Sequence, residues 1–147
     1  MNDLLKLATL ELERFLAASL PKLAEDWWPK HVINRLSFQQ QRFAQERHQT
    51  TLRDFDFAAF LRILDQNWKD LSNSVSLPKE GFGWVKELQT VRNKWAHQSS
   101  HEAPGSEVFR DVDTLGKVLA MIGASESALK QIETVKAEVV AQMADSS

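Results

Sequence analysis

Three polar side chains with complementary abilities lie within six residues of one another: Arg92, Asn93 and His97. Arginine supplies a permanent positive charge, asparagine both donates and accepts hydrogen bonds, and histidine takes up or releases a proton. Asn93 and His97 are four positions apart, so on a helix their side chains are neighbours. The set could therefore combine proton transfer, hydrogen bonding and positive charge at one place.

The apolar residues around these three indicate which way they point. At about 100° per residue, four side chains form one narrow core-facing stripe: Trp84, Leu88, Val91 and Trp95. Arg92 falls on the flank of that stripe, whereas Asn93 and His97 fall on the side facing away from it. Periodicity alone also fits a histidine that interacts with the helix dipole and an arginine whose methylenes cover the core edge.

The other candidate residues favour structural or surface roles. His31, His48 and His101 lie near predicted helix ends and loops, without the His-x-x-x-His spacing or carboxylate cluster of a metal site, and are predicted to be surface histidines. The glycines Gly81 and Gly83 flank Phe82 but lack the Lys-Ser/Thr of a phosphate-binding loop. The five tryptophans are predicted to pack in the core. No metal and no cofactor are expected.

Helical periodicity dominates the chain, and no segment has the pattern of a strand. The pattern predicts six helices, near 3–20, 30–47, 56–74, 79–98, 106–122 and 126–143. Asp54 or Asp56 can cap the third helix, Gly123 can end the fifth, and Ser125 can cap the sixth. We therefore expect an all-α, antiparallel helical bundle in one domain, 1–147, with its core at about 4–140 and a frayed tail at 141–147.

Composition excludes several classes of protein. The 147-residue chain has no cysteine, which excludes disulfides, cysteine-ligated zinc, iron–sulfur clusters and thiol catalysis. No apolar run approaches the roughly 20 residues that a membrane-spanning helix needs. The first residues do not resemble a secretion signal, so a cytoplasmic location is expected.

Charge is unevenly distributed along the chain. The net charge is −2, but residues 21–100 carry +3 and residues 101–147 carry −4. A mildly basic middle suits localised phosphate contacts better than a long electrostatic groove. A solvated surface would also account for most of these charges.

The segment from Val91 to Gln98, Val-Arg-Asn-Lys-Trp-Ala-His-Gln, resembles the signature of the HEPN superfamily (higher eukaryotes and prokaryotes nucleotide-binding domains). That signature is an arginine, usually followed by a polar residue, and then a histidine after four to six intervening residues. The fuller string is similar to the branch associated with a fungal endoribonuclease of nuclear mRNA surveillance. Asp26-Trp27-Trp28 and Asp65-Gln66-Asn67-Trp68 agree with that branch, and the likeness spans about residues 4–140.

The resemblance implies a metal-independent ribonuclease, usually a homodimer in which the Arg/His pairs of two subunits meet at the two-fold interface. It implies that Arg92 contacts the scissile phosphate and that Asn93 orients the imidazole or hydrogen-bonds the phosphate. His97 would remove the 2′-OH proton or protonate the leaving 5′-oxygen, for which an ordinary imidazole pKa of about 6.5 is suitable. The products would be a 2′,3′-cyclic phosphate and a 5′-hydroxyl.

RNA is the partner that this reading predicts. Lys94, Lys86, Arg42 and Arg53 are its candidate RNA-binding residues, with Arg35 and Arg47 as further members of a guiding surface. A motif that faces away from its own core is well placed to meet a symmetric copy. An antitoxin or an ATPase partner is also expected, because the branch occurs fused to larger machinery.

Three functional interpretations stay open on the sequence alone. The first is an endoribonuclease in a toxin, anti-phage defence or RNA-surveillance setting. The second is a non-catalytic HEPN module that dimerises, binds RNA or nucleotide, or regulates a partner ATPase or nuclease. The third is a plain structural helical domain with a coincidental motif.

Overall fold

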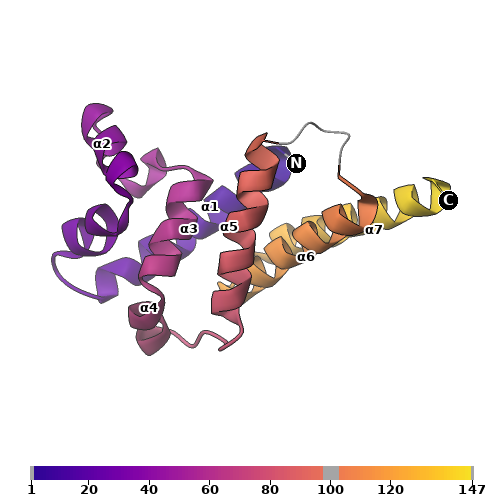
Figure 1. Ribbon diagram of the computed structural model, residues 1–147. Coiled ribbons are helices and arrows are strands. Elements are labelled where there is room, and N and C mark those ends of the chain that lie inside the picture. Colours follow the sequence, from indigo (N-terminus) through magenta and orange to yellow (C-terminus); the bar gives the residue numbers. More distant parts are fainter. Residues whose placement is uncertain (1, 98–102, 147) are drawn as a thin grey trace.

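The computed structural model describes residues 2–97 and 103–146, and within these ranges it contains helices and no strand (Figure 1). The α-helices are α1 (Asn2–Ser19), α2 (Phe38–Glu46), α3 (Phe57–Gln66), α4 (Trp68–Ser74), α5 (Gly81–His97), α6 (Gly105–Met121) and α7 (Glu126–Ser146). Four short turns connect them: the 3-10 turns η1 (Leu20–Lys22), η3 (Ile33–Arg35) and η4 (Leu52–Asp54), and the π-turn η2 (Trp28–Val32). The predicted all-α class is confirmed.

Helix α1 lies at the centre of the packing and contacts α3, α6 and α7. Its apolar side chains repeat every four residues, so Leu12 and Leu16 point to one side and are fully buried, as is Leu20 directly after the helix in η1. Each such leucine contributes roughly 1.5–3 kcal/mol by leaving water. The five tryptophans lie half-buried against this core, as the sequence predicts.

Helices α6 and α7 form an antiparallel hairpin whose connection was correctly predicted. Gly123 adopts a left-handed φ of 77°, and Ala124 N–H donates to the Leu119 carbonyl, which closes the end of α6. The Ser125 hydroxyl then caps α7 by accepting from Ala128 N–H at 3.2 Å. α7 continues to Ser146, beyond the expected helix end at residue 143.

The predicted helix over 30–47 is wrong. The chain instead turns through η2 and η3, becomes extended at Leu36, and begins α2 only after Ser37. Ser37 and Gln40 form a reciprocal capping box, in which each side chain accepts from the other's backbone N–H. α2 buries little beyond Ala44 and projects from the bundle (Figure 1). The thin apolar face of this segment explains why it does not pack as one long helix.

The predicted helix over 56–74 is also wrong as a single element, because it breaks at Asn67. The Asp56 carboxylate caps α3 by accepting from Ala59 N–H at 2.9 Å, as one of the two expected caps. At the break, the buried Asn67 amide donates to the backbone carbonyls of His31 and Ile63, both at 2.8 Å. The long-range bond to His31 ties the break between α3 and α4 to η2.

Helix α5 carries the predicted motif along the outside of the bundle. It packs on α3 and α6, and it crosses α6 at a steep angle (Figure 1). Leu88 and Val91 are buried, whereas Trp84 and Trp95 are half-buried against the core, so the predicted stripe is confirmed. Val85 joins them as a further buried residue.

Candidate functional site at the end of helix α5

The three motif residues occupy the positions that the helical pattern predicts. Asn93 and His97 are exposed on the outer side of α5, and Arg92 is half-buried on the flank of the stripe. Nη1 of Arg92 lies 3.4 Å from Oδ1 of Asn93, so these two groups are brought together. Within the described residues, His97 makes no hydrogen bond or ion pair with either of them. One chain therefore presents the groups on a shared surface without joining all three.

The charge of Arg92 is uncompensated in the part of the chain that the structure describes, 2–97 and 103–146. Its only polar contact there is the neutral amide oxygen of Asn93. By contrast, the neighbouring cation Lys94 is bound by two carboxylates. The guanidinium is therefore available to an anionic group that approaches the outer face of α5.

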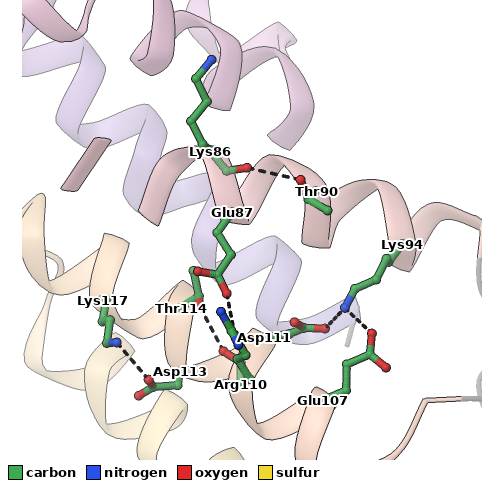
Figure 2. Close-up of polar contacts among 10 residues, drawn as sticks. All are labelled: Lys86, Glu87, Thr90, Lys94, Glu107, Arg110, Asp111, Asp113, Thr114 and Lys117. Atoms are coloured by element: carbon green, nitrogen blue, oxygen red, sulfur yellow. Dashed lines mark hydrogen bonds and ion pairs between the residues drawn. The ribbon is translucent and has the colours of Figure 1, made fainter. Parts of the chain in front are cut away.

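Lys94 fixes the end of α5 to α6. Its ammonium lies 2.5 Å from Glu107 Oε1 and 2.9 Å from Asp111 Oδ2, and the Asp111 side chain is buried (Figure 2). Partial burial opposes the charged form of Lys94, but hydrogen bonds to Asp111 and Glu107 outweigh it and raise the pKa of the ammonium. Lys94 is a positioning residue here, and an RNA contact by it stays a prediction.

A second ion pair reinforces this contact between helices. Nε of Arg110 on α6 lies 2.9 Å from Oε1 of Glu87 on α5, so this pair also joins the two helices (Figure 2). Sequence reasoning missed both acids of α6, Glu107 and Asp111. Their spacing of four residues indicates one helix face, but periodicity does not reveal which residue of another helix faces them.

Lys86, a second predicted RNA contact, ties α5 to α3. Its ammonium lies 2.7 Å from Oδ2 of the buried Asp65 and 5.2 Å from the ring centroid of Phe82. Half of the Lys86 side chain is exposed, so the ammonium remains accessible at the surface. Its role in RNA binding is not tested by this arrangement and stays a prediction.

The other two predicted RNA contacts, Arg42 and Arg53, are exposed and lie away from α5. Arg42 pairs loosely with Glu46 at 3.6 Å on α2, and Arg53 lies on η4. Their roles in RNA binding stay predictions.

Two large aromatic side chains are exposed on α2, which the sequence analysis did not single out: Phe38 at 77% and Phe43 at 48%. The Arg47 guanidinium lies 4.6 Å from the Phe43 ring centroid. Exposed aromatic rings beside arginines are a surface on which unpaired bases can stack.

The prediction that His31 is a surface residue is wrong. This residue of η2 is buried, and its Nδ1 lies 2.8 Å from Oδ1 of Asn67. His48 is exposed, as predicted, and takes a left-handed φ of 53° after α2. The prediction for His101 falls outside the described residues.

Neither a metal cluster nor a membrane span is found within 2–97 and 103–146. No three His, Asp or Glu side chains of these ranges are grouped so as to hold a metal ion. None of the helices there combines the length and the apolar character that crossing a bilayer requires.

The comparison with known families is decisive. A family model described as Swt1-like HEPN matches residues 3–123, which include all but the first residue of α1, the helices α2 to α6 and the whole Arg92–His97 motif. The chain belongs to the Swt1-like HEPN family. No curated protein and no solved structure matches the chain significantly.

Family membership confirms the predicted HEPN relationship, including the branch. It shows that the motif lies within a HEPN domain and is not a coincidence in an unrelated helical protein. The match ends at Gly123, so α7 of this HEPN domain lies outside the matched region.

Proposed function

We propose that this HEPN domain is a metal-independent endoribonuclease that works as a symmetric dimer through the outer face of α5. The observation that carries the proposal is the uncompensated guanidinium of Arg92 beside the exposed Asn93 and His97, on a helix end that Lys94 holds to α6. A phosphodiester is the anion that a positive charge and a nearby imidazole are suited to cleave.

A second copy supplies what one chain lacks. His97 of one copy removes the proton from the ribose 2′-OH, and the 2′-oxygen attacks the phosphorus. The bond from phosphorus to the 5′-oxygen breaks, and His97 of the other copy protonates this leaving oxygen. Arg92 stabilises the charge on the non-bridging oxygens, and Asn93 holds Arg92 through its Oδ1. The sequence of bond changes needs no metal, because every proton is handled by an imidazole.

The exposed surface of α2 is proposed to bind the RNA substrate. Phe38 and Phe43 offer stacking faces, and Arg42 and Arg47 offer positive charge. Single-stranded RNA combines unpaired bases with phosphates, so it is the substrate that these residues suit. The biological setting proposed with it is a toxin, anti-phage defence or RNA-surveillance role, with an antitoxin or ATPase as partner.

Cleavage of single-stranded RNAs in EDTA tests the proposal. Wild-type protein is expected to produce fragments ending in a 2′,3′-cyclic phosphate, and His97→Ala and Arg92→Ala are expected to lose a factor of about 10²–10⁴ in rate. His48→Asn is the matched control, because it removes an exposed imidazole outside the motif and keeps a residue that tolerates positive φ. Cleavage that persists in His97→Ala at the wild-type rate would refute the mechanism.

A second candidate function is a non-catalytic HEPN module that dimerises and regulates a partner ATPase or nuclease. The absence of any contact between His97 and Arg92 within the described part of one chain favours it. Measuring the solution mass and RNA cleavage on the same protein separates the two candidates. A dimer that is inactive on all RNAs supports the module, whereas RNA cleavage that depends on His97 excludes it.

A further inference from the structure

A polar pocket lies at the other end of the bundle from the α5 motif. It has a volume of about 280 Å³ and lies between η1, η2 and α4. Its polar lining consists of Lys22, Lys30, His31, Asp70, Asn73 and Ser74. Figure 1 shows α4 near the beginning of α5, whereas Arg92 and His97 lie at the end of that helix. The helix is 17 residues long, or about 25 Å, so the two places are separate.

Asn67 fixes which nitrogen of the buried His31 ring donates a hydrogen bond to it. Both amide hydrogens of Asn67 are committed to the carbonyls of His31 and Ile63, so the atom facing the imidazole is the acceptor Oδ1. Nδ1 of His31 must therefore carry a hydrogen and donate it to Asn67. The other ring nitrogen, Nε2, has no partner among the described residues.

His31 is one of the residues that line the pocket. Among the described side chains, only Nε of Arg35 is both sealed from solvent and without a hydrogen-bond partner. Nε2 of His31 consequently reaches solvent, although the residue as a whole is only 3% exposed. Because His31 lines the pocket, we infer that Nε2 reaches solvent there. This ring is not used in the proposed cleavage reaction.

The charges around the pocket favour an anion. Within 2–97 and 103–146, neither Lys22 nor Lys30 has an ion-pair partner, and both are exposed at the pocket. The only acid in the lining, Asp70, is 3.6 Å from Nη2 of Arg35, a cation outside the lining that balances its charge. The positive charges of the two lysines therefore have no compensating acid in the pocket lining.

We propose that this pocket, named the His31 pocket, binds a phosphate monoester. Lys22 and Lys30 hold the phosphate oxygens by charge-assisted hydrogen bonds, and the Ser74 hydroxyl and Asn73 amide are further donors. Nε2 of His31 accepts a hydrogen bond from the phosphate hydroxyl of the bound monoanion. Asp70 accepts from a hydroxyl of the ligand. The volume suits a phosphorylated sugar or a mononucleotide portion, near the lower limit of roughly 300 Å³ for small-molecule pockets.

Two sources could supply this chemistry, a free nucleoside monophosphate or the 5′-phosphate end of an RNA. The test uses the full chain as His97→Ala, so that cleavage at α5 cannot interfere and the outcome does not depend on the proposed nuclease activity. Inorganic phosphate, adenosine 5′-monophosphate and adenosine are each titrated by ¹H–¹⁵N NMR. Matched RNA oligonucleotides with a 5′-phosphate or a 5′-hydroxyl follow.

The expected result is saturable binding of inorganic phosphate and of the monophosphate, with shifts at residues 22–31 and 70–74. The Nε2 resonance of His31 should move, whereas Nδ1 stays protonated. Lys22→Met with Lys30→Met should raise the Kd about tenfold, while Lys130→Met, an exposed lysine on α7, should not. Preference for a 5′-phosphorylated RNA over its 5′-hydroxyl form assigns the RNA end as the source, and preference for the mononucleotide assigns the free ligand.

Three outcomes would overturn the His31 pocket. The first is chemical shifts that never saturate as the ligand is added. The second is an increase in Kd for Lys130→Met as large as that for the double variant of Lys22 and Lys30. The third is adenosine binding as tightly as its monophosphate. Because both lysines are exposed, the double substitution should leave the fold intact, and a circular dichroism spectrum checks this. Failure of RNA cleavage by the wild-type protein would count against the proposed nuclease and would leave these titrations unaffected.

Discussion

Nζ of Lys94 lies 2.9 Å from Oδ2 of Asp111, and this ion pair joins the motif-bearing end of α5 to a buried carboxylate on α6. The lysine follows Arg92 and Asn93 directly in the sequence, and His97 is three residues further on. The fixed position that the proposed acid–base chemistry needs at an exposed helix end is therefore supported by a neighbouring residue rather than by the motif itself.

Substitution of Lys94 by methionine should destabilise the domain by about 2 kcal/mol, because Asp111 would remain as a buried charge without its partner. Urea denaturation measures this change. RNA cleavage should fall as well, with an unchanged pH profile, because the imidazole is still present. Lys117→Met is the control: its pair with Asp113 is half-exposed and should contribute no more than about 0.5 kcal/mol.

Asn67→Ala should cost about 2–4 kcal/mol, since it leaves the His31 carbonyl and the Nδ1–H of His31 without their hydrogen bonds in a buried place. The Ile63 carbonyl would keep its bond from the backbone N–H of residue 67. Thermal unfolding followed by circular dichroism measures the loss. Asn34→Ala, at an exposed position of η3, should change stability by less than about 0.5 kcal/mol. Equal effects of the two substitutions would contradict the structural role of Asn67.

The contribution of Asp113 to stability should depend on pH. The hydrogen bond from Lys136 at 2.8 Å lowers the pKa of the Asp113 carboxyl, with a smaller effect from Lys117. A lowered pKa in the folded state means that this contribution is complete above the ordinary aspartate pKa and is lost as the pH falls through the lowered value.

Asp113→Asn should therefore be about 1 kcal/mol less stable than wild type at pH 6, and the difference should shrink below about pH 4. Urea denaturation at a series of pH values measures it. Glu133→Gln is the matched control, because the exposed Glu133 pairs with the same lysine at 3.5 Å. A gap that grows on acidification would contradict the sign.

Replacing the ribose 2′-OH at the cleaved position by hydrogen or O-methyl should abolish cleavage, since the 2′-oxygen is the proposed nucleophile. An otherwise identical RNA in the same EDTA buffer, separated on a denaturing gel, is the comparison. Binding should persist within about threefold, because phosphates and bases are unchanged. Cleavage of the modified RNA at the same bond would show that a different nucleophile acts.

Phe38→Ser should weaken binding of single-stranded RNA by about five- to tenfold, the loss expected for one stacked base. The ring is largely exposed, so stability should change little. Fluorescence anisotropy in a His97→Ala background measures the affinity. Leu10→Ser, at an exposed apolar position of α1, should leave the affinity unchanged. If both substitutions act equally, the surface of α2 is not the RNA contact.

Most of the architecture could be predicted because it depends on local patterns. The apolar stripe of α5, the left-handed Gly123 and the caps by Asp56 and Ser125 all follow from residues within one or two turns of each other. These patterns place the motif on the outer face of α5, and the structure agrees.

Two features that the sequence did not reveal, the helix break at Asn67 and the partner of Lys94, arise from long-range contacts that no local pattern contains. Leu64, Trp68 and Leu71 continue one apolar stripe through Asn67, so the helix appeared unbroken until His31 provided the partner for its amide. Similarly, the partner of Lys94 lies on another helix, and periodicity does not fix the register between helices. Both contacts depend on how separate elements meet.

The family match ends at Gly123, yet α7 fits closely onto the helix before it. A Cβ atom on Gly116 would lie 2.9 Å from Cγ2 of Ile132, and Lys136 bonds to Asp113 across the same contact. A shortened chain that stopped at the family boundary would leave one flank of α6 facing water and would tend to self-associate. Biochemical work on this HEPN domain should therefore retain α7. An oligomer formed by the shorter chain could result from contacts of the exposed α6 flank and would then say nothing about the proposed pairing of two α5 faces.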